Sequence, residues 1–206
     1  MVRNSDGMTF EQRFEHAYRV MSSSRFLEMK GLGNEVPYFI LTYQPQDEPK
    51  LAAARDRLLR RLRGDGTKVC EIDLWALASR LWRATGIFDQ ILAAEPSMTK
   101  SEFGDNVANV VSPVEYLSPL IAEQVRALDP PPKVTVLSNV GRLFPLVRAH
   151  AILNTLQPLV SDVPVVLIFP GSFRQSTTQG SSLELFDKLT DDDYYRAFDL
   201  LDQETN

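Results

Sequence analysis

The fold is decided by Lys133-Val-Thr-Val-Leu-Ser-Asn-Val-Gly-Arg142, a helical pattern to about Leu156, and Val163-Pro-Val-Val-Leu-Ile-Phe-Pro-Gly171. Two short runs of β-branched and apolar residues therefore flank a helix. This order predicts two parallel strands joined by a crossover helix, spanning roughly 142–156. Because both runs are continuously apolar, we expect both strands to be buried on both faces, with helices covering the sheet on each side.

The same alternation extends toward the N-terminus. Strands are predicted at 37–43 and 68–74, with a helix at 48–63 between them, and helices are predicted at 74–83, 87–95, near 99–109 and at 112–128. The predicted fold class is a three-layer α/β fold with a mainly parallel sheet of four or five strands flanked by helices. Its topology would be Rossmann-like or P-loop-like, without a phosphate loop.

The two ends of the chain have their own patterns. Residues 1–8 are polar and are expected to be disordered, and Thr9 with Gln12 predicts a capped helix at 9–21. Near the C-terminus we expect a polar loop at 172–180, a short edge strand at 182–186 and a helix capped by Thr190. No linker or repeat interrupts the chain, so residues 1–206 are predicted to form a single α/β domain.

The composition limits which cellular compartment and which class of partner are expected. The chain has 206 residues, 44% hydrophobic and 24% charged, with a formal net charge of -5. The net acidity argues against a dedicated nucleic-acid binder. Cys70 is the single cysteine and cannot form an internal disulfide, which fits a reducing compartment. With no apolar run of membrane-spanning length at its start, the protein is expected to be cytoplasmic.

A phosphate-binding loop is the first site to look for in such a fold, and no Gly-x-x-x-x-Gly-Lys-[Ser/Thr] motif occurs. Asn139, Gly141 and Arg142 follow a predicted strand and precede a predicted helix. They could bind an anion through helix N–H groups and a cation. The alternative is a tight strand-to-helix turn capped by Ser138 or Asn139.

Few other residues carry a chemical signal. Asp73 lies at the predicted carboxyl end of its strand and is the best candidate for a cation or acid–base role. His150 falls on the apolar face of the crossover helix, where a hydrogen-bonded core histidine is the alternative to a base or ligand. Ser172 follows Pro170-Gly171 but lacks the Gly-x-Ser-x-Gly context of a nucleophile. No metal is predicted.

Two surface features suggest contacts. The predicted helix 48–63 places Arg57, Arg60 and Arg61 opposite its apolar stripe. Such a face could bind phosphates, but it is more commonly a solvated helix surface. Tyr195 and Arg196 have the composition of an interface anchor. The alternative for Tyr195 is packing on the domain's own edge strand, near Leu183 and Leu185.

Several segments resemble the family of the B component of bacteriophage-exclusion (BREX) systems. They are Gly31-Leu-Gly-Asn-Glu-Val-Pro-Tyr38, Arg148-Ala-His150, Leu153-Asn-Thr-Leu-Gln-Pro158, Val163 to Gly171, and Asp193-Tyr-Tyr-Arg-Ala-Phe198. The resemblance covers nearly the whole chain in the right order. In this sequence the loop 172–181 is longer than the family's usual turn, and Asp187 stands where a glycine is common.

The resemblance implies a phage-defence protein that works beside a large ATPase, an adenine-specific DNA methyltransferase and an alkaline-phosphatase-like protein. It supplies no catalytic residues. It marks Gly31, Gly33, Arg148, His150, Pro170 and Gly171 as motif residues with an expected structural role.

Three hypotheses follow, of which a DNA-contacting accessory protein is disfavoured by the net negative charge. The first is a non-catalytic assembly or adaptor subunit that docks on other BREX components and needs no cofactor. The second is a nucleotide- or anion-sensing or enzymatic subunit that uses the carboxyl edge of the sheet, with Asp73, Asn139, Arg142 and His150. A nucleotide or divalent metal that raises the melting temperature would favour the second, because a ligand of the native state stabilises it.

Overall fold

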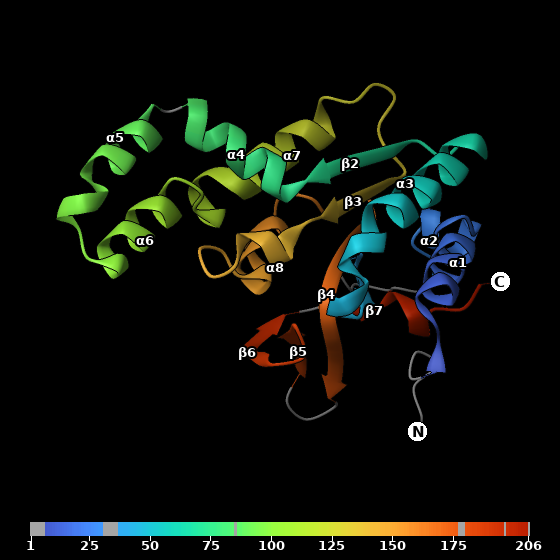
Figure 1. Ribbon diagram of the computed structural model, residues 1–206. Helices are drawn as coiled ribbons and strands as arrows, with labels where there is room; N and C mark the ends of the chain where they lie inside the picture. Colours follow the sequence, from blue (N-terminus) through green and yellow to red (C-terminus); the bar gives the residue numbers. More distant parts are fainter. Residues whose placement is uncertain (1–6, 31–36, 85, 177–179, 196, 206) are drawn as a thin grey trace.

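The computed structural model describes residues 7–30, 37–84, 86–176, 180–195 and 197–205, with side chains at 87–88, 175–181 and 190–195 left aside (Figure 1). The predicted disorder at residues 1–8 therefore falls mostly outside the described residues. The motif glycines Gly31 and Gly33 and the interface candidate Arg196 also lie outside them, as does the side chain of Tyr195.

A parallel sheet forms the middle layer. In the described part of the chain, five strands pair in parallel in the order β2-β3-β4-β1-β7. Their bounds are β1 (Tyr38–Tyr43), β2 (Val69–Asp73), β3 (Val134–Ser138), β4 (Val165–Ser176) and β7 (Phe198–Asp199). The predicted mainly parallel sheet is confirmed. The last half of β4 continues past the sheet and pairs in antiparallel fashion with β5 (Gly180–Leu185), which pairs with β6 (Leu189–Tyr195).

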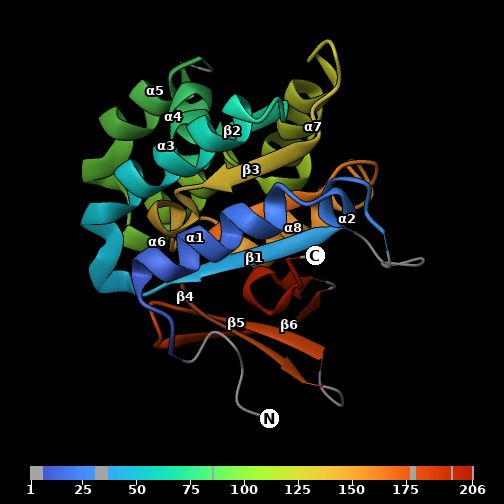
Figure 2. The same ribbon diagram turned by 90° about the vertical axis from the view of Figure 1, so that its right-hand side faces the viewer.

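Helices cover both faces of the sheet (Figures 1 and 2). The helices α1 (Phe10–Met21), α2 (Ser24–Leu27) and α3 (Glu48–Gly64) lie on one side. The other side carries α4 (Leu74–Ala84), α7 (Ser118–Arg126) and α8 (Ala149–Leu156). Between α4 and α7, α5 (Ile87–Ala94) and α6 (Lys100–Asn109) extend away from the sheet (Figure 1). This arrangement is the predicted three-layer α/β fold.

The strand sequences explain the two cores. Every residue of β1 is buried. Tyr38 and Ile40 pack with the α4–α8 layer, whereas Phe39 and Leu41 pack with α1 and α3. Because successive side chains of a strand point to opposite faces, a strand buried on both sides must be apolar or have its polar groups hydrogen-bonded. The hydroxyl of Thr42 accepts from Nη1 of Arg13 at 3.1 Å. The buried hydroxyl of Tyr38 donates to the carbonyl of Val160 at 2.8 Å.

The crossover between β3 and β4 differs from its prediction at the start. A single 3-10 turn, η5 (Val140–Leu143), follows β3, and α8 begins only at Ala149. The predicted start at Arg142 is wrong because Pro145 restricts Phe144 to extended backbone, with φ −67° and ψ 138°. The helix therefore starts after the proline, with Arg148 as its N-cap residue.

The C-terminal prediction needs a larger correction. The predicted helix from Thr190 is the strand β6, and much of the predicted loop 172–180 is the extension of β4. Thr190 and Asp193 do match a capping box, but Asp and Tyr are poor residues for a helix interior and β5 offers a free edge for pairing. A strand is confirmed near the predicted 182–186, as β5, but its predicted edge position is wrong because β5 pairs with β4 on one side and with β6 on the other.

His16 gives this fold an expected pH dependence. Its side chain is buried under the C-terminal segment, with Nε2 3.1 Å from the carbonyl oxygen of Gln203. Burial lowers the pKa of His16 below its ordinary 6.5, although the bond to Gln203 works in the opposite direction. His16 therefore binds a proton more readily in the unfolded chain than in the native protein. Its contribution to the free energy of unfolding is fully present above pH 6.5 and is lost as the pH falls below that value.

We expect the urea concentration at the unfolding midpoint to decrease when the pH is lowered from about 7.5 to about 5.5. This decrease with pH should be smaller for His16→Gln, whose amide can still donate to the carbonyl of Gln203. The carboxylates of Glu15, Glu28 and Glu102 have pKa values lowered from an ordinary 4.5. Their protonation therefore changes the stability only at more acidic pH than that of His16. An equal decrease for the two proteins would contradict the assignment to His16.

Candidate functional site

The carboxyl edge of the sheet brings together Asp73, the last residue of β2, and Asn139, which follows β3. The amide Nδ2 of Asn139 donates to Oδ2 of Asp73 at 2.6 Å. The other carboxylate oxygen of Asp73 accepts from the backbone N–H of Ala76 at 2.9 Å and so caps the first turn of α4. Both predicted site residues therefore lie at this edge, but they satisfy each other's hydrogen bonds.

The loop after β3 is tightly packed rather than open. A Cβ added at Gly141 would lie 2.7 Å from Cγ of Pro170 and 3.4 Å from the ring of Phe186. Asn139 itself adopts left-handed backbone, with φ 61°. These contacts favour the tight-turn alternative for this loop, and the anion site stays a prediction.

Arg142 lies close to a carboxylate at this edge. Its Nε lies 4.0 Å from Oε1 of Glu48, the first residue of α3, and both side chains are about half exposed. The hydroxyl of Tyr43 donates to the same carboxylate, and burial together with this bond raises the pKa of Tyr43. An anion arriving here would have to displace Glu48 from Arg142.

The other motif residues lie around the same edge. Gly171 has φ +138° where β4 leaves the parallel sheet, directly after Pro170. Arg148 and His150 begin α8, and His150 is half-buried. Their structural role stays a prediction, as does the interface role of Tyr195 and Arg196.

The arginines of α3 divide into two groups. Arg61 is paired with Glu15 at 2.5 Å, and Arg55 and Arg63 both contact Glu71, at 3.3 and 3.1 Å. Arg57 and Arg60 are exposed and form no ion pair or side-chain hydrogen bond with any residue that the structure describes. The face is therefore a mixture of paired and free charges, which is weaker than a continuous basic patch for binding a phosphate backbone.

Nucleophile and metal chemistry find little support in the described residues. Burial raises the pKa of the Cys70 thiol to about 11, so it is protonated at neutral pH. Within the described ranges, no group of three His, Cys, Asp or Glu side chains is arranged to hold a metal ion. No described helix is both long enough and apolar enough to cross a bilayer.

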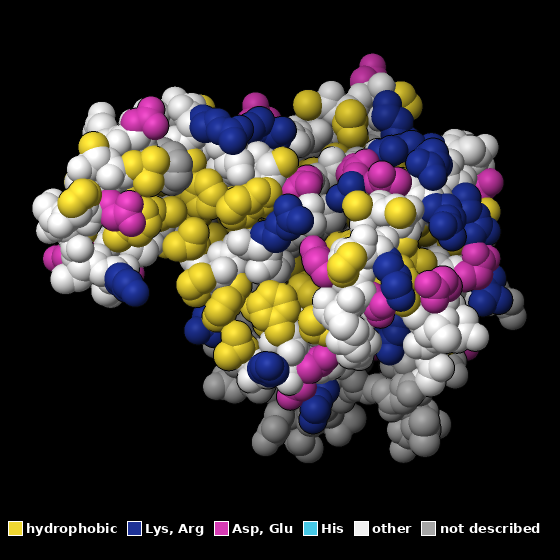
Figure 3. Space-filling view, viewed as in Figure 1, with side chains coloured by type: hydrophobic (Ala, Val, Ile, Leu, Met, Phe, Trp, Pro, Cys, Tyr) yellow, Lys and Arg dark blue, Asp and Glu magenta, His cyan; other side chains and the backbone are white. Residues whose placement is uncertain are grey.

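An apolar surface at the carboxyl edge was missed by sequence reasoning. We define the edge surface as Trp75, Phe144, Phe186 and Leu189. Trp75, on the first turn of α4, is 37% exposed, and Phe186 and Leu189, at the β5–β6 turn, are 36% and 41% exposed. Figure 3 shows hydrophobic side chains gathered from the α4–α6 region down to this turn. Exposed apolar groups of this size commonly mark docking surfaces.

The turn that carries Phe186 has unusual backbone. Phe186 and Asp187 have φ values of 57° and 55°, a left-handed conformation that a bulky residue rarely adopts. The turn is held by the N–H of Phe186, which donates to the carbonyl of Pro170 at 2.9 Å. The one sequence signal for it was Asp187, at a position where glycine is common in the resembled family. Strained backbone of this kind often occurs at functional surfaces.

Comparisons with known proteins agree on one family. The family model described as BREX protein BrxB matches residues 70–200. A BREX protein BrxB of Bacillus cereus (strain H3081.97) is 30% identical over 193 residues, which cover 93% of this chain and 97% of the relative. A BREX protein BrxB of Escherichia coli O9:H4 (strain HS) is 25% identical over 193 residues, which cover 93% and 91%. No solved structure matches this chain. The chain belongs to the BrxB family of BREX proteins, as the resemblance of its motifs indicated.

Proposed function

We propose that this protein is a non-catalytic assembly subunit of a BREX defence complex and that it docks on another BREX component through the edge surface. Family membership supports a role within BREX. The observation that carries the docking proposal is the exposure of Trp75, Phe186 and Leu189 around one end of the sheet. The large ATPase, the alkaline-phosphatase-like protein and the DNA methyltransferase are the candidate partners.

The physical argument rests on what these side chains gain from a partner. An exposed tryptophan and phenylalanine each offer a large apolar area, and such residues dominate binding energy at protein interfaces. Beside them, Leu185 and Leu189 line a small apolar hollow with Phe144 and Val147. This hollow has a volume of only about 20 Å³, so the projecting anchors, and not the hollow, would supply most of the contact with a partner.

The second hypothesis, a nucleotide or anion sensor at this edge, meets an electrostatic obstacle. Glu48 and Asp73 place carboxylates next to Arg142 and Asn139, where phosphate oxygens would have to lie. We therefore expect ATP with Mg²⁺ to leave the melting temperature unchanged. A rise that grows with ATP concentration would favour the sensor.

The docking proposal predicts the effect of Trp75→Gln combined with Phe186→Asn. Glutamine is a good helix former, and asparagine tolerates left-handed backbone better than phenylalanine, so the variant should remain folded. When the whole defence island is co-expressed, we expect at least about tenfold less partner to co-purify, which corresponds to about 1.4 kcal/mol. The loss should appear mainly as faster dissociation.

A matched control is available on the turn before α7. Val114 and Tyr116 are 67% and 42% exposed and lie outside the edge surface. Val114→Ala with Tyr116→Ala should leave partner capture unchanged. Undiminished capture by the edge variant, or an equal loss in the control, would remove the edge surface from the proposal.

A further inference from the structure

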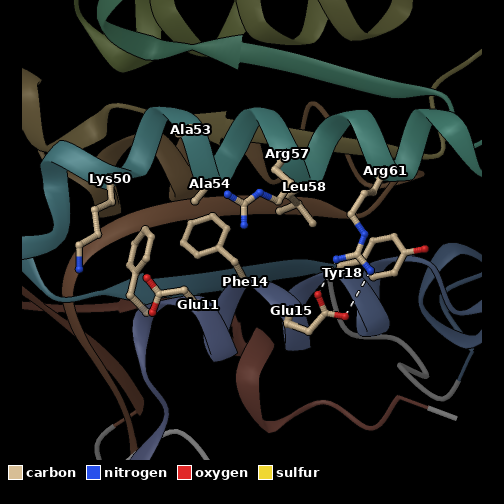
Figure 4. A pocket seen from close by; sticks show the side chains of 11 residues that line it. Glu11, Phe14, Glu15, Tyr18, Lys50, Ala53, Ala54, Arg57, Leu58 and Arg61 are labelled. Carbon is tan, nitrogen blue, oxygen red and sulfur yellow. Dashed lines mark hydrogen bonds and ion pairs between the residues drawn. The ribbon is translucent and has the colours of Figure 1, made fainter.

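A groove of about 300 Å³ separates α1 from α3 (Figure 4). It lies on the side of the sheet opposite α4–α8 (Figure 2). Phe14 and Leu58 contribute its apolar floor, with Ala53 and Ala54 from α3. The two alanines leave space that larger side chains would fill. The groove is therefore separate from the edge surface in both position and composition.

The two walls of the groove carry opposite charges. Glu11 and Glu15 come from α1, whereas Lys50, Arg57 and Arg61 come from α3. Arg61 pairs with Glu15 at 2.5 Å and lies 3.6 Å from the ring centroid of Tyr18, which closes one end of the groove. The charges at this end are thus already compensated within the protein.

The open part of the groove contains Glu11 from α1 and the cations Lys50 and Arg57 from α3. Lys50 lies at the other end, 2.8 Å from Asp47 and 5.7 Å from the ring centroid of Phe10. Arg57 reaches from α3 over the middle of the groove (Figure 4). It has no ion-pair or hydrogen-bond partner among the described residues. An uncompensated guanidinium beside an apolar floor is suited to a ligand with a carboxylate next to an apolar group.

We propose that this groove binds a short acidic segment of a protein partner, which places one apolar side chain on the floor and a carboxylate on Arg57. The groove is open to solvent between Lys50 at one end and the Arg61–Tyr18 pair at the other, so a short segment can enter it from the solvent side. Glu11 and Glu15 line only the α1 wall, so the carboxylates of the segment must lie along the α3 wall beside Arg57. A nucleic-acid backbone, with a charge on every nucleotide, could not keep its phosphates away from the α1 wall. Because the groove and the edge surface lie apart, this partner is additional to the one proposed above.

The test uses a blocked synthetic peptide, acetyl-Asp-Glu-Leu-Phe-Glu-Asp-amide, titrated into the full-length ¹⁵N-labelled protein. We expect saturable shifts at the backbone amides of Ala53, Ala54 and Arg57. A peptide with lysine at the four acidic positions should not produce them, and neither should one with serine in place of leucine and phenylalanine. Arg57→Glu should weaken binding at least about tenfold.

Arg60→Glu is the matched control, because Arg60 is exposed on the same helix, lies outside the groove and undergoes the same change of charge. It should alter the affinity less than about threefold. Equal weakening by the two variants would reduce the effect to general charge and overturn the proposal. No saturable shift at millimolar peptide, or shifts located at the edge surface, would also overturn it. The edge variant Trp75→Gln/Phe186→Asn should bind the peptide normally, so the two docking proposals can fail separately.

Discussion

Gly171→Ala is expected to destabilise the protein by about 3–5 kcal/mol, a large fraction of the stability of an ordinary domain. Gly171 has φ +138°, which an alanine cannot adopt without strain. A Cβ at this position would lie 2.0 Å from the carbonyl oxygen of Glu184 and 3.0 Å from the backbone nitrogen of Phe186. Both are backbone atoms of the β5 strand and its turn, so no side-chain rotation can relieve the clash.

The measurement is urea unfolding followed by far-UV circular dichroism, with the midpoint falling and the slope unchanged. Gly104→Ala is the control, because Gly104 lies within α6 and a Cβ there meets nothing within 4 Å. That substitution should stabilise the protein by about 0.5–1 kcal/mol through helix propensity. A loss below about 1 kcal/mol for Gly171→Ala would show that the junction between β4 and β5 can relax.

Trp82→Ala is expected to cost about 3–5 kcal/mol by leaving a large cavity between α4 and α6. Trp82 is 6% exposed and belongs to the same core cluster as Ile91 and Val107. Its Nε1 donates to the carbonyl of Val107 at 3.0 Å. Because Val107 lies in the last turn of α6, its carbonyl is among those that a helix leaves without an internal partner. The indole therefore both fills the core and caps α6.

Trp82→Phe separates the two contributions, since the ring still packs but the donor is lost. We expect it to cost about 1–3 kcal/mol, the typical penalty for a buried carbonyl without its partner. Trp75 packs edge-on against Trp82, with 5.7 Å between ring centroids, but it is partly exposed. Trp75→Gln should therefore cost less than about 1.5 kcal/mol. A larger cost for Trp75→Gln than for Trp82→Ala would contradict this division between core and surface.

The parallel strands were predictable because their signal is local and strong. Residues 38–43, 69–73 and 134–138 are short apolar runs between helical patterns, and each forms a strand of the central sheet. The helix α1 was predictable for a similar reason. Thr9 and Gln12 form the expected capping box, with both hydrogen bonds present at 3.2 and 2.8 Å.

The C-terminal region was not predictable from the same rules. The capping pattern of Thr190 and Asp193 is a local signal, whereas the strand β6 is stabilised by pairing with β5. That pairing depends on the left-handed turn at Phe186 and Asp187, and on Gly171, where the chain leaves the parallel sheet. The pairing of β6 with β5 therefore outweighed the local helical preference of residues 190–193.

The edge surface shows the same limit for function. Trp75 and Phe186 are more than a hundred residues apart in the chain. They belong to the same edge of the sheet because α4 contacts η5 and the ring of Phe186 lies beside Gly141 of η5. The individual residues looked ordinary in sequence, and their exposure could be known only after every neighbouring element was placed.

By itself, the sequence determined the layered α/β class, the two buried faces of the central strands, the capped helix α1 and the family. Those properties follow from residue periodicity and from short motifs, which act over a few neighbouring positions. The tertiary structure alone decided the strand order, the β4–β6 extension, the pairing of Asp73 with Asn139, and which apolar and charged side chains stay exposed. These depend on contacts between distant segments, whose free energy exceeds the small preferences of individual residues.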